Sequence, residues 1–124
     1  MRVHQYSQDT GKLGEDIATT QLWHQGYAIL ARRYRTRYGE IDIVAQDGAT
    51  LVFVEVKARR SDRFGGAAES VTPWKQRRLA AMALDYLAWV GRLNAPCRFD
   101  VVAIDRLGSD EVSIRHIKAA FLAE

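Results

Sequence analysis

The sequence predicts an α/β protein with a mixed central β-sheet. Patterns of helical period and short β-rich runs follow one another in the order helix, three strands, helix, two strands. The 124 residues suffice for one core, and the hydrophobic and charged fractions, 48% and 27%, are ordinary for a soluble globular domain. We therefore expect a single domain over residues 1–124.

The first helix is predicted to begin near Asp9 or Thr10 and to end before Gly26, which suits the position after a helix. The preceding segment, residues 1–9, is expected to be a loose N-terminal arm. Glu15 lies beside the apolar stripe of this helix. One interpretation of Glu15 is an acid in the first turn that complements the helix dipole.

A first strand begins at residues 27–30 and runs through several arginines into a hairpin. The hairpin joins residues 39–46 to residues 49–57. Asp47-Gly48 connects them and is the dipeptide that best suits a type I′ turn. The sequence therefore predicts a two-residue loop at this dipeptide.

Glu55 interrupts a strand that is otherwise apolar on both faces. Such a strand normally lies in the middle of a sheet, covered on both sides. A carboxylate there is costly to desolvate unless it is paired, hydrogen-bonded or bound to a metal. We therefore expect Glu55 to be largely buried and to have a function.

The predicted loop places four charged side chains on one face of the hairpin. They are Glu40, Asp42, Glu55 and Lys57. A three-residue loop would move Asp42 to the other face. Two carboxylates beside a lysine suit Mg²⁺, which takes oxygen ligands and usually keeps several waters and phosphate oxygens.

The second helix has Thr72 as its N-cap and Pro73 at its first position, and it ends at Gly91. Lys75 is expected to point towards the sheet. With Gln76 it makes the helix N-terminus a natural phosphate site. The alternative is that Lys75 only extends past the edge of the core.

The last two strands are predicted over residues 99–104 and 112–117. Asp100 is expected to bond a neighbouring arginine or the backbone, without a chemical role. The lone Cys97 fits a reducing cytoplasm and is expected to be a small buried residue. The sequence shows neither a signal peptide nor a run of membrane-spanning length, so we predict a cytoplasmic protein without membrane contact.

The net charge of +3 permits a nucleic-acid partner without arguing for one. Basic residues cluster before the hairpin, after it and at the start of the second helix: Arg32, Arg33, Arg35, Arg37, Lys57, Arg59, Arg60, Arg63, Lys75, Arg77 and Arg78. Solvated faces are the alternative interpretation. Trp74 and Trp89 are interpreted as packing residues rather than as base-stacking surfaces.

Asp42, twelve intervening residues and then Glu55-Val56-Lys57 resemble the D…E-x-K signature of the PD-(D/E)XK nuclease superfamily. The fuller pattern, GEID followed by VFVEVKAR, VTPWKQRRL and RFDVVAID, closely resembles the YraN family, which is similar to archaeal Holliday-junction resolvases. Arg33 stands where that family more often has asparagine. The resemblance implies a restriction-endonuclease-like fold with the order αβββαββ.

The resemblance also implies a metal-dependent endonuclease of the resolvase type, which hydrolyses phosphodiester bonds in structured nucleic acid with Mg²⁺ or Mn²⁺. The implied metal ligands are Asp42, Glu55 and the backbone carbonyl of Val56. Glu15 would reach the metal through water, and Glu40 would support the ligands. Lys57 would position the attacking water or stabilise the transition state.

The nucleic acid, expected to be DNA, would be held by its backbone. The residues expected to hold it are Lys75, Gln76, Arg59, Arg60 and Arg37. A resolvase-like role favours a homodimer, by analogy alone. Two other functions stay open: a non-catalytic nucleic-acid-binding module or complex subunit, and a protein–protein adaptor in which the Glu55–Lys57 pair is only structural.

Overall fold

The computed structural model describes residues 3–61 and 71–121 of the chain. Within these ranges the elements follow the predicted order of helix, three strands, helix and two strands. They are α1 (Val3–His24), β1 (Ala28–Thr36), β2 (Gly39–Asp47), β3 (Thr50–Ala58), α2 (Pro73–Val90), β4 (Cys97–Asp105) and β5 (Ser113–Phe121). This arrangement confirms the α/β class and the αβββαββ order.

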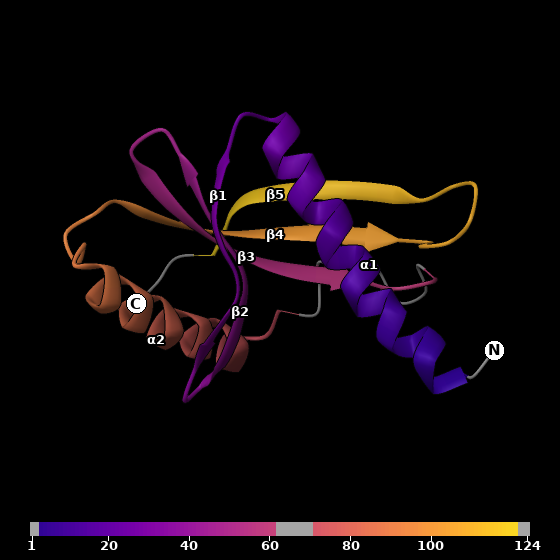
Figure 1. Ribbon diagram of the computed structural model, residues 1–124, viewed down its shortest axis with the longest axis horizontal. Helices are drawn as coiled ribbons and strands as arrows, with labels where there is room; N and C mark the ends of the chain where they lie inside the picture. The colour runs from indigo at the N-terminus through magenta and orange to yellow at the C-terminus, as the bar shows by residue number, and fades with distance from the viewer. Residues whose placement is uncertain (1–2, 62–70, 122–124) are drawn as a thin grey trace.

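The five strands form one mixed sheet in the order β1-β2-β3-β4-β5. Neighbouring strands are antiparallel except for β3 and β4, which are parallel. Parallel neighbours need a crossover connection, and α2 lies between them in the chain. Figure 1 shows α1 crossing in front of the sheet, with α2 beside its other face. The described part of the chain has no helix long and apolar enough to cross a membrane.

Strand β3 is the central strand and separates two hydrophobic layers. Its side chains alternate between the layers, as the two-residue period of a strand requires. Val52 and Val54 pack in the layer that contains the α1 residues, and Leu51 and Phe53 pack in the layer under α2. All four are completely buried. The alternation continues with Val56 on the α1 side.

The hairpin loop is one residue later than predicted. Asp47 pairs with Thr50 in the ladder, so the loop is Gly48-Ala49 and not Asp47-Gly48. Gly48 has a φ of 61°, the sign that a type II′ turn needs at its first central residue. Asp47 remains in the strand, where its carboxylate accepts a hydrogen bond from Arg98 at 3.0 Å. The register moves by two residues, an even shift that keeps the side chains of the paired residues 43–47 on their predicted faces.

The prediction of a loose N-terminal arm over residues 1–9 was wrong from Val3 onwards, because α1 already begins at this residue. The segment before Thr10 contains neither glycine nor proline, so the helix extends through it at one hydrogen bond per residue. Residues 1–2 lie outside the described part of the chain. The predicted end before Gly26 is confirmed.

Three residues expected to be buried are exposed: Trp74, Trp89 and Cys97. The buried stripe of α2 consists of Leu79, Met82, Ala83, Tyr86 and Leu87. Trp74 stands in the first turn, about a quarter of a turn or more outside this stripe. Trp89 lies in the last turn, where Val90 is also exposed. The packing interpretation was therefore wrong for both tryptophans.

Candidate functional site

A break in the alternation of β2 creates the site. Ile41 packs in the α2 layer, whereas Ile43 packs in the α1 layer, although residues two apart on a regular strand share a face. On the neighbouring strand Arg33, between the partners of Ile41 and Ile43, has a left-handed φ of 53°. The distortion brings Asp42 to the backbone of β3, where the Val56 N–H donates to Asp42 Oδ2 at 2.8 Å.

A cavity of about 300 Å³ lies beside Asp42, between the sheet and α1. The described residues that line it are Gly11, Glu15, Asp42, Val56, Lys57 and Ala58. Three of the residues singled out for chemistry by the sequence, Glu15, Asp42 and Lys57, thus line one cavity. They come from α1, β2 and β3.

The electrostatics of Asp42 are unusual for a carboxylate. Burial, and then the negative charge of Glu55, raise the pKa of Asp42 to about 7. Glu15 raises this pKa further, whereas the hydrogen bond from Val56 N–H and the charge of Lys57 lower it. The raised pKa shows that burial and the nearby carboxylates disfavour the ionised form of Asp42 more than the Val56 N–H and Lys57 favour it.

Glu55 is less buried than expected and has a partner. Lys57 Nζ lies 3.1 Å from Glu55 Oε2, and each side chain is about one-fifth exposed. Lys75 from α2 lies near this pair. The positive charge of Lys57 is the largest cause of the lowered pKa of Lys75. Lys75 therefore points towards the sheet, as predicted. Lys57 and Lys75 repel each other beside Glu55, and a phosphate group bound there would reduce this repulsion.

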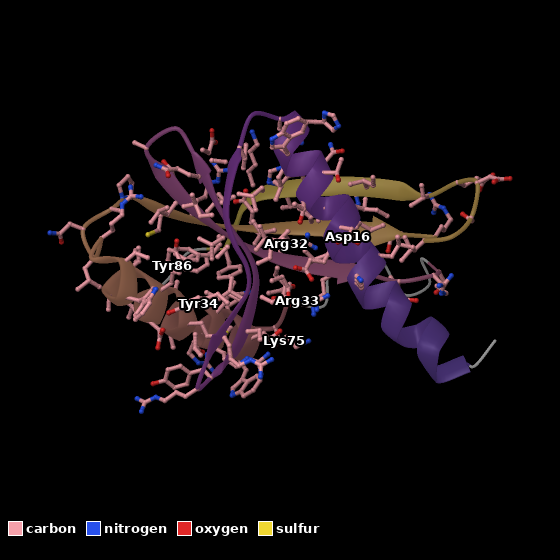
Figure 2. The ribbon with its side chains drawn as sticks, in the orientation of Figure 1. Asp16, Arg32, Arg33, Tyr34, Lys75 and Tyr86 are labelled. Carbon is pink, nitrogen blue, oxygen red and sulfur yellow. The ribbon has the colours of Figure 1, made fainter. Side chains whose placement is uncertain are left out.

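Glu15 is a buried acid with two arginine partners. Its side chain is 7% exposed, and its oxygens lie 2.7 Å from Arg33 Nε and 3.1 Å from Arg32 Nε. Figure 2 shows Arg32 pointing towards Asp16, whose carboxylate it also contacts at 2.6 Å. Because α1 begins at Val3, Glu15 is not in the first turn, and the helix-dipole interpretation was wrong.

Glu40 and Arg37 lie outside the cavity. Glu40 is exposed and pairs with Arg35 at 2.6 Å. Arg37 lies over the ring of Tyr38, 5.1 Å from its centroid. The hairpin face predicted from the sequence therefore holds Glu55 and Lys57 together with Asp42 near them, while Glu40 forms an ion pair of its own on the surface.

Two other residues expected to hold nucleic acid form bonds within the protein. Gln76 Nε2 donates to the carbonyl of Val71 at 3.2 Å. Arg60 Nε donates to Thr10 Oγ1 at 3.0 Å. The backbone of Arg59 extends the pairing between β3 and β4. The side chains of Gln76 and Arg60 thus help to hold the chain around the cavity.

Sequence reasoning missed most of a second charged group, centred on Asp100. This residue is completely buried. It accepts hydrogen bonds from Arg98 Nε at 2.9 Å and from the Ala119 N–H at 3.0 Å, and His116 Nε2 lies 2.7 Å from its other oxygen. The expected arginine and backbone bonds are confirmed. The spacing Arg98-x-Asp100 on one strand was the available signal for the arginine, but no local pattern pointed to His116 on the next strand.

The fold and the site define a mixed α/β protein with an Asp–Glu–Lys group where β2 and β3 separate. The sequence profile of the family described as "Uncharacterised protein family UPF0102" matches residues 14–104, which contain this group. This chain belongs to the UPF0102 family, which is the YraN family predicted from its motifs.

Relatives from several bacteria support this assignment. A UPF0102 protein of Symbiobacterium thermophilum is 50% identical over 117 residues, which cover 94% of this chain and 99% of the relative. A UPF0102 protein of Geotalea uraniireducens is 50% identical over 111 residues, covering 90% and 87%. A UPF0102 protein of Ralstonia pickettii is 55% identical over 100 residues, covering 77% and 80%. The similarity thus extends over nearly the whole fold.

Proposed function

We propose that the protein is a metal-dependent endonuclease that hydrolyses phosphodiester bonds in structured nucleic acid. The observation that carries this proposal is the convergence of Asp42, Glu55 and Lys57 beside a cavity. An Asp–Glu pair near a lysine has the composition that metal-assisted hydrolysis of a phosphate ester needs. The D…E-x-K resemblance supports the same reaction.

The residues present fit Mg²⁺ or Mn²⁺. Such ions take one or two protein carboxylates and complete their shell with water and phosphate oxygens. Asp42 and Glu55 supply two carboxylates, and the charge of Glu55 already disfavours ionisation of Asp42, so a cation between them would relieve the repulsion. The Val56 carbonyl is the expected third ligand. When bound, the ion would lower the pKa of a water molecule and offset charge that develops on the phosphate.

The other residues have distinct proposed roles. Lys57, held by Glu55 at 3.1 Å, stabilises negative charge on the reacting phosphate or orients the attacking water. Glu15 faces the same cavity and accepts a hydrogen bond from water there. Lys75, with the basic residues Arg37, Arg59 and Arg60, holds the nucleic-acid backbone.

One observation favours a second candidate, a non-catalytic nucleic-acid-binding module. Within the described residues no three His, Cys, Asp or Glu side chains come together as metal ligands. Glu15 is already neutralised by Arg32 and Arg33. This candidate retains the lysines for binding phosphate but does not account for the carboxylates of Asp42 and Glu55 beside them, because negative charge near phosphates weakens binding.

Cleavage and equilibrium binding on one panel of DNAs separate the two candidates. The panel contains single-stranded, duplex and branched DNA, with Mg²⁺, Mn²⁺ or chelator. Lys57→Ala should remove cleavage and leave most of the affinity, because other basic residues contact the backbone. Lys75→Ala should weaken binding to all sequences and reduce the slope of log affinity against log salt by about one.

The result for the wild-type protein decides between a hydrolase, a binding module and an adaptor. A protein that binds the DNA panel but cuts with neither metal is a binding module. A protein that neither binds nor cuts leaves the adaptor function. Branched DNA should be the preferred substrate for the resolvase-type action, and a homodimer in light scattering would fit it. The proposal places this activity in a reducing cytoplasm.

A further inference from the structure

A second pocket lies on the surface at the start of α2. Its volume is about 410 Å³, and the described residues that line it are Tyr38, Trp74, Arg77 and Arg78. Tyr38 belongs to the turn between β1 and β2, and the other three belong to the first turns of α2. The pocket thus combines two aromatic rings with two guanidinium groups and contains no acidic residue among the described lining residues.

The aromatic rings of this pocket are available to a ligand. Tyr38 is 42% exposed and Trp74 is 59% exposed, so neither contributes much to the core. The guanidinium of Arg78 lies 4.8 Å from the Trp74 ring centroid, and that of Arg37 lies 5.1 Å from the Tyr38 centroid. Planar cations already stack on these rings, which shows that the ring faces accept flat groups.

The pocket and the proposed catalytic centre both involve the first turn of α2. Trp74 directly precedes Lys75, whose pKa is lowered chiefly by the charge of Lys57. The turn that carries Tyr38 is held against α2, because Tyr34 on β1 donates a hydrogen bond to Asp85 on α2 at 2.7 Å. A nucleotide in the pocket and a phosphate at Lys57 and Lys75 would therefore belong to the same nucleic-acid strand.

We propose that this pocket binds an unpaired nucleobase, stacked on Trp74 or Tyr38, while Arg77 and Arg78 contact the adjoining phosphates. In a duplex each base face is covered by its neighbours, so only an unstacked base presents a free face to an aromatic side chain. Within the described part of the chain no carboxylate is paired with Arg77 or Arg78, and both are exposed. The pocket therefore selects nucleic acid with a single-stranded segment beside the phosphate at Lys57.

A protein partner is the other ligand class for an exposed aromatic pair. The lining favours nucleic acid, because an apolar peptide side chain would gain nothing from the two arginines. A base with its phosphate uses all four lining residues, the rings for stacking and the arginines for charge. The proposal rests on the proposed function only in placing this nucleotide beside the site at Asp42.

The test measures binding of a fluorescein-labelled single-stranded DNA by anisotropy, in chelator so that no cleavage occurs. Trp74→Ala should raise Kd about tenfold, and Tyr38→Ala should raise it as well, since stacking on one aromatic ring commonly changes affinity by such factors. Trp74→Phe should restore most of the affinity. Trp89→Ala is the matched control, because this residue is an exposed tryptophan at the other end of α2, and its Kd should equal that of the wild type.

Two further DNAs identify the bound group. A blunt duplex should bind wild type and Trp74→Ala equally, and so should a strand of the same length made of abasic residues. Equal Kd values for wild type and Trp74→Ala on single-stranded DNA would overturn the proposal. An equal loss for Trp74→Ala on the abasic strand would overturn it too, because no base is then involved.

The outcomes also separate this inference from the proposed hydrolysis. If the wild type binds single-stranded DNA through Trp74 but never cuts DNA with either metal, the pocket stands and the hydrolase proposal fails. If the wild type cuts DNA and Trp74→Ala binds and cuts every DNA as the wild type does, the hydrolase stands and the pocket fails.

Discussion

Asp42 on β2 and Asp100 on β4 are two acids of the same sheet whose pKa values move in opposite directions. Burial alone would raise both pKa values. At Asp100 the hydrogen bonds from His116, Arg98 and the Ala119 N–H outweigh burial and lower the pKa to about 2. At Asp42 burial prevails, and the pKa rises to about 7. The partners, and not the depth of burial, decide the sign.

The difference separates an acid whose charge is compensated by its partners in the fold from one whose ionised form is disfavoured. Asp100 joins β4 to β5 through His116 and the Ala119 N–H, and Arg98 on its own strand offsets its charge. Asp42 has one backbone donor, and Glu55 and Glu15 add further negative charge to its surroundings. The Asp42 carboxylate thus lies where its ionised form is disfavoured, and the cation of the proposed function would reverse this.

The largest effect is expected for Asp42→Asn. Cleavage should fall by at least about a hundredfold, the scale on which loss of one electrostatic group in an active site is felt. The Tm in chelator should stay the same or rise, because the change removes repulsion with Glu55. The rise in Tm that Mg²⁺ or Mn²⁺ gives the wild type should disappear. Cleavage assays and thermal melts with and without metal measure these effects.

Asp110→Asn is the control for this prediction. It makes the same chemical change at an exposed acid in the turn between β4 and β5, and it should behave as the wild type in both assays. An Asp42→Asn protein that gains as much Tm from metal as the wild type would refute the assignment of Asp42 as a ligand.

Asp100→Asn, unlike Asp42→Asn, should lower the stability of the protein. Asp100→Asn removes the charged partner of Arg98 and a hydrogen-bond partner of His116, and breaking a buried pair in this way costs about 3–5 kcal/mol of unfolding free energy. For a chain of this size the Tm should fall by roughly 10 °C or more. Urea unfolding without metal measures the loss. A variant as stable as the wild type would mean that the Asp100 bonds are not a net source of stability.

The pH dependence of unfolding should differ between the two acids in sign. The pKa of Asp100 is lower in the folded state than in the unfolded chain, so its stabilisation is present above about pH 4 and is lost as the pH falls towards 2. The pKa of Asp42 is higher in the folded state, so its contribution is present below about pH 4 and is lost as the pH rises through 7. In each variant the unfolding free energy should lack the part of the pH dependence that the missing carboxylate contributes.

Unfolding curves in chelator, taken from pH 2 to pH 8, test both windows. The difference in unfolding free energy between wild type and Asp42→Asn should change mainly between pH 4 and 7. The difference for Asp100→Asn should change mainly below pH 4. Titrations of other residues cancel in these differences. A flat difference for Asp42→Asn between pH 4 and 7 would show that its carboxylate is not shifted in solution.

The comparison also shows what the sequence could reveal. The element order, the central strand and the residues Asp42, Glu55 and Lys57 follow from local patterns, because alternation and turn residues act over a few positions. The neutralisation of Glu15 by Arg32 and Arg33 depends on the packing of α1 against β1, which no local pattern encodes. The partners of Asp100 likewise come from two strands.

The exposure of Trp74 was missed for a related reason. The helical period places Trp74 outside the buried stripe of α2, but which elements surround the first α2 turn depends on tertiary packing. The same holds for its neighbour in space, Tyr38, which lies far from it in the sequence. The pocket between them is a tertiary feature, so the sequence alone predicted neither its rings nor their availability.

The smallest expected effect concerns Arg33, a partner of the third acid, Glu15. Arg33 has a φ of 53°, a left-handed conformation that asparagine adopts more readily than most residues, and its Nε contacts Glu15 at 2.7 Å. Arg33→Asn loses the contact but suits the backbone, and Glu15 keeps Arg32, so the Tm should change by no more than about 4 °C. Arg33→Ala loses the contact without the backbone benefit and should have a lower Tm than Arg33→Asn. Thermal melts of the three proteins compare them. If Arg33→Asn is less stable than Arg33→Ala, the left-handed backbone is not what makes this position costly.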